Sequence, residues 1–218
     1  MNSLSELPPQ RSTAMERLLL REFSHRTNNE LASAISLISV AASRCSSNDA
    51  RMALATVHDR LQSYARVHHS LQMPEYSTTI DLTAYIHQLC QAISHSKLET
   101  RGIELSLSLY PLRMSSERCW LLGMIVFELI TNAARHAFRD GGGTIHLDLL
   151  PAGASVVCCI TDNGTSEPSP SPGRGLSIID ALVASLQGTV ESQFGPNGTR
   201  AIVKLPSDEY PRQPPDMG

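Results

Sequence analysis

Apolar residues recur every three or four positions over two long stretches near the N-terminus, and this pattern limits the fold more than any other feature. It predicts one helix over about residues 14–45 and a second over about residues 50–72. The polar residues 46–49 between them offer a turn and an N-cap. Two long helices joined by so short a turn form an antiparallel hairpin. A single hairpin leaves part of each apolar stripe uncovered, so we expect a homodimer built around a four-helix bundle.

The composition fits a folded chain with an aliphatic core. Of the 218 residues 41% are hydrophobic and only 5% are aromatic. The net charge of -3 gives no reason to expect a nucleic acid or a membrane surface as partner. No apolar run is long enough to span a bilayer, residues 1–17 lack the apolar centre of a signal peptide, and the five cysteines show no metal-ligand spacing. These features favour a cytoplasmic protein with free thiols.

The pattern along the chain divides it into four segments. We expect a flexible lead-in over residues 1–14, the hairpin over 15–75, a second domain over 80–206 and a flexible tail over 207–218. The second domain mixes helices and strands, which gives the whole chain an α+β fold. Its predicted helices cover about residues 82–100, 116–138 and 176–187, and Asp81 is the expected N-cap of the first of them. Its predicted strands cover about residues 103–109, 144–150, 155–161, 188–193 and 199–205.

One histidine, His25, lies outside the apolar stripe of the first helix. Its neighbours one turn away are Arg21, Asn28 and Asn29. The imidazole should therefore project into solvent, where a second domain could reach it. An ordinary surface histidine is the simpler interpretation of this segment taken alone.

A polar set lies on the apolar helix predicted over residues 116–138. Glu128, Asn132 and Arg135 share one face at spacings of four and three. A carboxylate, an amide and a guanidinium are costly to bury without partners. They suggest a base, an oxygen ligand for Mg²⁺ and a phosphate contact, while a solvated helix face explains them equally well.

Three further elements hold residues that could contact a nucleotide. Asp162 and Gly164 follow a strand, where such a sequence is usually a turn, but a carboxylate held there could accept a hydrogen bond from an exocyclic amine. Gly173 and Gly175 open a helix, where exposed N–H groups and the helix dipole favour a phosphate. Thr199, before the last strand, is uninformative by itself.

In their order and spacing these elements resemble the nucleotide-binding domain shared by histidine kinases, gyrase-type ATPases, Hsp90 and MutL. Within that group the chain is most similar to sensor histidine kinases of the HWE-related branch. Residues 23–31 resemble the phosphoacceptor motif of that branch, residues 67–71 resemble the end of its second helix, and residues 128–138 resemble its N box. The resemblance covers about residues 17–206.

The resemblance implies an α/β sandwich with a mixed sheet that binds ATP and Mg²⁺. It implies that His25 accepts the γ-phosphoryl group, which then passes to an aspartate in the receiver domain of a response regulator. Asn132 would ligate Mg²⁺, Glu128 would act nearby as a polar or basic helper, and Arg135 would touch phosphate.

The same resemblance assigns the adenine and triphosphate contacts. Asp162 would accept a hydrogen bond from the adenine amine, Gly164 would leave room for the base, and Thr199 would support that contact through water. Gly173 and Gly175 would wrap the triphosphate.

Three departures from the family pattern are reasons to consider other functions. Arg26 follows His25, where many histidine kinases carry an acidic base. The turn after Asp162 lacks a second glycine, and the short loop over residues 165–172 carries three prolines, Pro168, Pro170 and Pro172. No sensor domain precedes the hairpin, so a separate sensor protein is one source of the signal.

Two alternatives follow. A histidine phosphotransferase could keep this architecture without binding ATP, although the intact ATP-site residues argue against it. An anti-sigma factor kinase would keep the ATP site but would not need His25.

Overall fold

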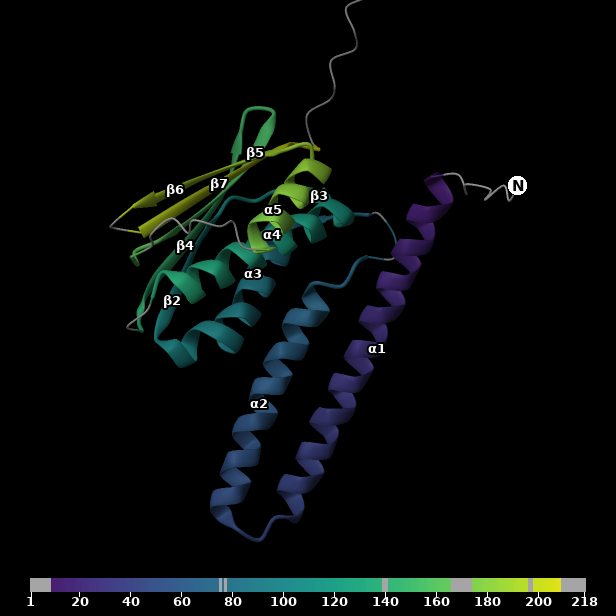
Figure 1. The fold of residues 1–218 in the computed structure, drawn as a ribbon, viewed down its shortest axis with the longest axis vertical. Coiled ribbons are helices and arrows are strands. Elements are labelled where there is room, and N and C mark those ends of the chain that lie inside the picture. Colours follow the sequence, from purple (N-terminus) through teal and green to yellow (C-terminus); the bar gives the residue numbers. More distant parts are fainter. Residues whose placement is uncertain are drawn as a thin grey trace, which may run out of the picture. The chain divides into compact units, whose positions relative to one another are not determined.

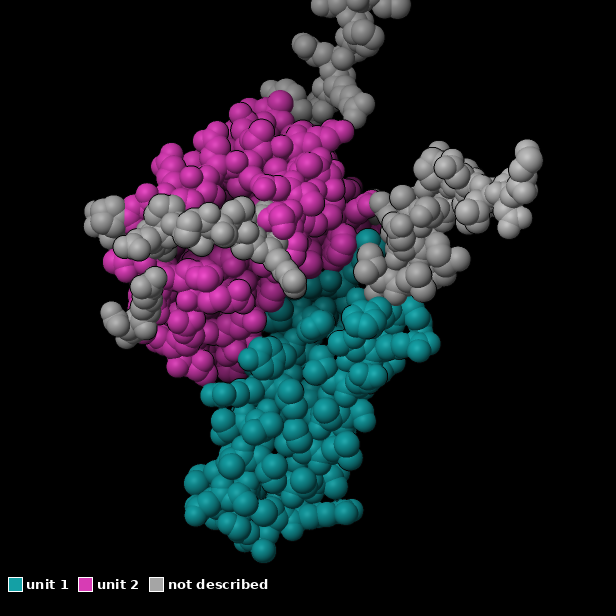
Figure 2. Space-filling view, viewed as in Figure 1, with its two compact units in different colours: residues 1–73 teal, residues 74–218 magenta. Residues whose placement is uncertain are grey.

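The computed structural model describes residues 9–74, 76, 78–138, 141–165, 174–195 and 198–208, with the backbone alone for residues 9–21 and 174–176. The chain divides into two compact units, residues 1–73 and residues 74–218 (Figure 2). Among the described helices, none has a stretch that is both long and apolar enough to cross a lipid bilayer.

The first unit is the predicted helical hairpin (Figure 1). Helix α1 spans Pro9–Arg44 and helix α2 spans Asn48–Ser70. Helix α1 begins earlier than the expected residue 14, and a proline in the first helical turn costs little because its missing N–H would have no partner there. Ser47 caps α2, since its side-chain oxygen accepts a hydrogen bond from the Ala50 N–H at 3.4 Å. The predicted turn and cap are confirmed.

Each hairpin helix also exposes apolar side chains. In α1, Ile35 and Ile38 are half-buried, whereas 69% of Leu37 is exposed. The large exposed apolar residues of the hairpin are Phe23, Leu37, Val40, Met52, Val57 and Tyr64. We call Leu37 and Val40, three positions apart on α1, the exposed α1 face.

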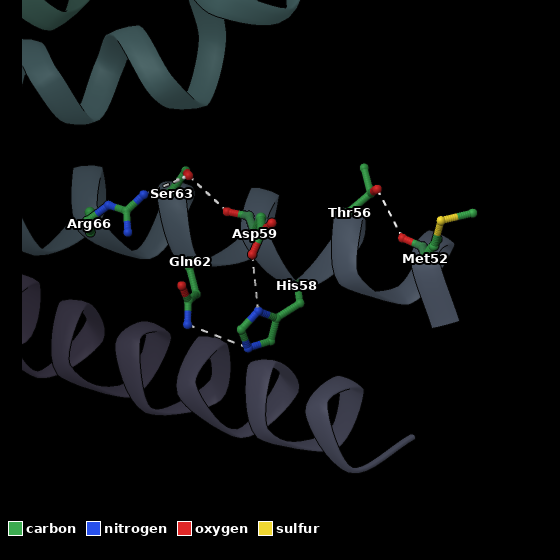
Figure 3. Close-up of polar contacts among 7 residues, drawn as sticks. All are labelled: Met52, Thr56, His58, Asp59, Gln62, Ser63 and Arg66. Atoms are coloured by element: carbon green, nitrogen blue, oxygen red, sulfur yellow. Dashed lines mark hydrogen bonds and ion pairs between the residues drawn. The ribbon is translucent and has the colours of Figure 1, made fainter. Parts of the chain in front are cut away.

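Polar contacts link side chains along α2 (Figure 3). His58 lies between Asp59 and Gln62, with both contacts at 3.5 Å, and the side chains of His58 and Gln62 point toward α1. Ser63 donates to the backbone carbonyl of Asp59 at 2.8 Å and accepts from Arg66 at 3.0 Å. These bonds lie within α2, so they stiffen the helix without joining it to another element.

The second unit contains a five-stranded mixed sheet in the order β2-β4-β5-β7-β6. Strands β2 and β4 are parallel, and the other neighbours are antiparallel. The strands are β2 Ile103–Leu109, β4 Gly143–Ala152, β5 Ser155–Asp162, β6 Thr189–Gly195 and β7 Gly198–Pro206. The five predicted strands are all present, with bounds that differ from the predicted ones by at most two residues.

Helices α3 (Leu82–Ile93), α4 (Ser116–His136) and α5 (Arg174–Ser185) lie on one side of this sheet (Figure 1). Successive residues of a strand face opposite sides. In β4 the buried residues Ile145, Leu147 and Leu149 therefore meet the helices, while the intervening residues are partly exposed. The predicted fold class, a helical hairpin followed by a mixed sheet with helices, is confirmed.

The third helical segment ends close to the predicted residue 100, but its last part is not α-helical. Asp81 caps α3 as expected, because its Oδ1 accepts from the Ala84 N–H at 2.9 Å. The α-helix stops at Ile93, continues as a π-helix over Ser94–Leu98, and ends in a 3₁₀ turn over Glu99–Arg101. Gly102 then adopts a φ of 65°, a left-handed conformation that glycine tolerates and that turns the chain into β2.

A small two-stranded sheet, which the sequence pattern did not reveal, joins the start of the second unit to α4. Strand β1 (Thr79–Asp81) pairs with β3 (Arg113–Ser115). Ser116, the first residue of α4, accepts from the Thr78 N–H at 3.1 Å and donates to the Tyr76 carbonyl at 2.8 Å. At three residues each, these strands are too short to show a periodicity.

The N-terminus of α4 is also fixed by a residue that we expected in a flexible tail. Asp208 accepts from the Ser115 N–H at 2.9 Å and forms an ion pair with Arg118 at 3.0 Å. A carboxylate suits this position, because the N-terminus of a helix carries partial positive charge.

The cysteines are free thiols, as predicted. Cys90, Cys119, Cys158 and Cys159 are buried, and Cys45 is half-buried. Burial raises the pKa of Cys90 and of Cys119 to about 12, so both thiols stay protonated at neutral pH. Among the described residues, no three histidine, cysteine or acidic side chains are grouped as a metal site would require.

Candidate active site

Helix α4 holds the predicted polar set at the edge of the core. Its apolar residues Leu122, Ile125 and Ile130 are fully buried. Glu128 and Asn132 are half-buried, and Arg135 is exposed. Within the described part of the chain, no hydrogen bond or ion pair reaches the side chains of these three residues. Their polar atoms are therefore available to a ligand.

Asp162 lies at the end of β5 and brings two other predicted residues together. Its Oδ1 accepts hydrogen bonds from the backbone N–H groups of Gly164 at 3.0 Å and of Thr199 at 3.2 Å. The Thr199 contact to Asp162 is direct and uses the backbone N–H, while the expected support of the adenine contact through water stays a prediction. With Oδ1 held by two N–H groups, the second carboxylate oxygen has no donor among the described residues. It can accept a hydrogen bond from an amine.

Gly164 is required by close packing against the end of α4. A side chain at this position would place its Cβ 2.3 Å from the Ala137 carbonyl oxygen. The next residue, Thr165, donates its N–H to that same oxygen at 3.0 Å. The turn that follows Asp162 is thus attached directly to the helix that carries Asn132 and Arg135. This contact places the two predicted residue groups in one site.

Asn163 fixes the other side of the turn. Its Oδ1 accepts from the Thr144 N–H at 2.8 Å, and its own N–H donates to the Thr144 carbonyl at 3.2 Å. Asn163 was not among the residues that we expected to shape the site. An amide directly after Asp162 was the available signal, since asparagine side chains often bond to nearby backbone in turns.

The predicted phosphate-binding glycines are only partly visible. Gly175 lies in the first turn of α5. Gly173 and the three prolines of the loop over residues 165–172 lie outside the described residues.

His25 lies in the hairpin, on α1, and is exposed as predicted. The neighbouring Arg26 forms an ion pair with Glu22 at 2.8 Å, and this hydrogen bond raises the pKa of Arg26. One turn further on, the Asn28 Oδ1 is buried and has no hydrogen-bond partner. The surroundings of His25 are therefore polar and open to another molecule or domain.

These features define a class of protein: a hairpin with an exposed histidine, followed by a mixed-sheet unit with a nucleotide-type site. A family model described as histidine kinase matches residues 22–97, and one described as histidine kinase-like ATPase domain matches residues 109–204. The two matches together cover most of the chain. The chain belongs to the histidine kinases, as its sequence resemblance indicated.

Curated relatives of the chain are also named histidine kinases. Blue-light-activated histidine kinase 2 of Erythrobacter litoralis is 25% identical over 210 residues, which are 91% of this chain and 59% of that protein. The sensor histidine kinase PdtaS of Mycobacterium tuberculosis is 28% identical over 198 residues, 86% of this chain and 39% of that protein. The chain thus spans between two fifths and three fifths of the length of these two relatives.

Solved structures share the fold. The histidine kinase domain of a blue-light activated histidine kinase from Erythrobacter litoralis has a TM-score of 0.59 at 19% identity, over 83% of this chain and 97% of that one. A bacterial phosphotransferase has a TM-score of 0.59 at 11% identity, over 87% of this chain and 96% of that one. Identities this low establish the architecture alone.

Proposed function

We propose that the protein transfers the γ-phosphoryl group of ATP to His25 and then to an aspartate in the receiver domain of a response regulator. The observation that carries this proposal is the direct attachment of the Asp162 turn to α4. This attachment supports the proposal because it joins the turn that carries Asp162 to the end of the helix that carries the unpartnered Asn132 and Arg135. The use of ATP fits a cytoplasmic location.

The residues of the site fit ATP with Mg²⁺. Asp162 would accept the adenine amine, supported by Gly164 and Thr199. The half-buried amide of Asn132 offers a neutral oxygen of the kind that Mg²⁺ accepts alongside phosphates and water. Bound Mg²⁺ would neutralise charge on the phosphates.

Glu128 and the triphosphate contacts complete the assignment. Glu128 would act nearby as a polar or basic helper and Arg135 would touch phosphate. Gly173 and Gly175 would wrap the triphosphate, and the place of Gly175 in the first turn of α5 supports this role for that residue.

The reaction at His25 is a phosphoryl transfer. A neutral ring nitrogen attacks the γ-phosphorus, a P–N bond forms, and the bond between the γ-phosphorus and the bridging oxygen breaks to release ADP. The ring, which keeps the N–H on its other nitrogen, is then positively charged, and it becomes neutral again by releasing that proton to solvent. Imidazole suits this step because its ordinary pKa lies near neutrality, so the nucleophilic neutral form is populated.

A kinase assay tests the proposal. The full chain is incubated with γ-labelled ATP and Mg²⁺, then treated with acid or alkali. We expect protein-bound label that is lost in acid and kept in alkali, as a phosphohistidine requires. A control with α-labelled ATP should leave the protein unlabelled.

The phosphotransferase alternative predicts a different result. It would give no label from ATP and no ATP binding at millimolar nucleotide, while the protein would still accept phosphate from a phosphorylated receiver domain. A bacterial phosphotransferase shares the fold, so the fold alone does not distinguish the two functions and the assay must do so. The unpartnered ATP-site side chains favour the kinase.

We further propose that two chains pair through the hairpin as a homodimer. Leu37→Glu places a charge on the exposed α1 face and should convert the dimer to monomers, because a carboxylate is costly to desolvate. Light scattering should give twice the 23.7 kDa of one chain for the unmodified protein and 23.7 kDa for the variant. Ile38 would be a poorer probe, because it is already half-buried within a single chain.

Ser39→Glu, a charge at an exposed polar position of the same helix, is the matched control and should stay dimeric. A mass near that of one chain for the unmodified protein at micromolar concentration would contradict the dimer. It would also imply that phosphorylation occurs within one chain.

A further inference from the structure

The C-terminal turn of α4 is held by an arginine from a distant part of the second unit. Arg101, the last residue of the 3₁₀ turn before β2, donates through Nη1 to the Ala134 carbonyl and through Nη2 to the Phe138 carbonyl at 3.2 Å. Its own carbonyl accepts from the Gly142 N–H at 2.9 Å. The backbone of Arg101 is therefore fixed to the start of β4 while its guanidinium binds α4.

The bond to Ala134 satisfies the special need of a helix end. The last four carbonyl groups of a helix lack partners within it, and they carry partial negative charge. Ala134 supplies one of these carbonyls, and Phe138 follows the helix end by two residues. A guanidinium presents several N–H donors in a fixed plane, so one side chain can reach two carbonyls at once.

A second element binds the same turn of α4. The Ala137 carbonyl accepts from Thr165, and Gly164 packs against the same residue. The end of α4 is thus bonded both to Arg101 and to the turn after Asp162. Arg135 is within three residues of all three carbonyls, and Asn132 is two residues from that of Ala134.

We propose that Arg101 is a positioning residue of the nucleotide site. It fixes the last turn of α4 against the Asp162 turn, and it thereby sets the distance between the adenine acceptor and the residues assigned to Mg²⁺ and phosphate. This inference rests on the proposed ATP-binding function. Arg101 acts through α4, because its guanidinium is occupied by the two carbonyls.

Calorimetry with ATP and Mg²⁺ tests this proposal on the full chain. Arg101→Ala should raise the Kd for ATP by about tenfold, a coupling of ordinary size between two linked sites. Arg101→Lys should recover part of the affinity, because an ammonium can reach one carbonyl but not two in a plane. Arg113→Ala is the matched control, since Arg113 is also exposed and also donates to a carbonyl, that of Thr79 at 3.2 Å, but at β1–β3.

Two readouts separate positioning from general destabilisation. The ATP concentration for half-maximal autophosphorylation should rise about tenfold in Arg101→Ala, while the rate at saturating ATP stays within about twofold of the unmodified protein. Amide hydrogen exchange without nucleotide should increase at residues 133–138 and at Thr165 but remain unchanged in the hairpin.

Each contrary outcome has a clear meaning. An unchanged Kd in Arg101→Ala, or unchanged exchange at the end of α4, would overturn the role of Arg101 and leave the kinase proposal intact. An equal loss of affinity in Arg113→Ala would also overturn it. Failure of the unmodified protein to bind ATP would reject the proposed function itself, and the role of Arg101 in nucleotide binding with it.

Discussion

Replacing His25 with alanine should abolish labelling of the protein by γ-labelled ATP while leaving its affinity for ATP unchanged. His25 is exposed on α1, in the hairpin, whereas the nucleotide-site residues all lie in the second unit. The substitution therefore removes the proposed nucleophile without disturbing the site that holds the donor. Its effect on folding should be small, because an exposed helix position accepts alanine readily. The expected loss is complete, since no other group can replace a missing nucleophile.

The hairpin offers matched controls for this result. His68 and His69 are exposed histidines on α2, and replacing either with alanine should preserve the label. Calorimetry with ATP and Mg²⁺ should give the same Kd for all three variants. Persistent acid-labile label on His25→Ala would remove His25 from the mechanism, and loss of label in His69→Ala alone would transfer the role to that residue.

Replacing Asp162 with asparagine should weaken ATP binding by about 10- to 100-fold, as expected for the loss of a hydrogen bond to a charged acceptor. The asparagine oxygen can still accept from Gly164 and Thr199, so the local backbone should keep its conformation. The other carboxylate oxygen, however, becomes an NH₂ group. A donor then faces the adenine amine, where an acceptor is needed.

The same change should shift the preference between nucleotides. Guanine carries a carbonyl where adenine carries its exocyclic amine, so Asp162→Asn should bind GTP relatively better than the unmodified protein does. Asp148→Asn is the control, because Asp148 bonds to His146 at 2.9 Å on β4 and not to the Asp162 turn. Equal Kd values for ATP in Asp162→Asn and the unmodified protein would place adenine elsewhere.

Asn132→Ala complements this test at the other end of the site. It should reduce the part of the ATP affinity that depends on Mg²⁺ and leave binding without Mg²⁺ nearly unchanged, because the variant loses only an oxygen ligand. An unaltered Mg²⁺ dependence would mean that another residue of α4 holds the ion.

The sequence by itself determined the elements of this protein, because the signals for them are local. The spacing of apolar residues defined α1, α2 and α4, and the side chains of Ser47 and Asp81 marked helix starts that the structure confirms. Each signal lies within a few residues of the feature it predicts. The order of the motifs indicated the family, whereas the roles of single residues remain proposals.

The tertiary structure alone decided how these elements form a site. Parallel pairing of β2 with β4 depends on a crossover through α4, and no periodicity within either strand reveals it. Nothing around Arg101 in the sequence indicates that its guanidinium binds the end of a helix 33 residues further on. The sequence indicates only that Gly164 is a turn residue. Its contact with Ala137 in the folded chain explains why no side chain fits there. These features are set by contacts between residues far apart in the chain, and such contacts exist only once the chain has folded.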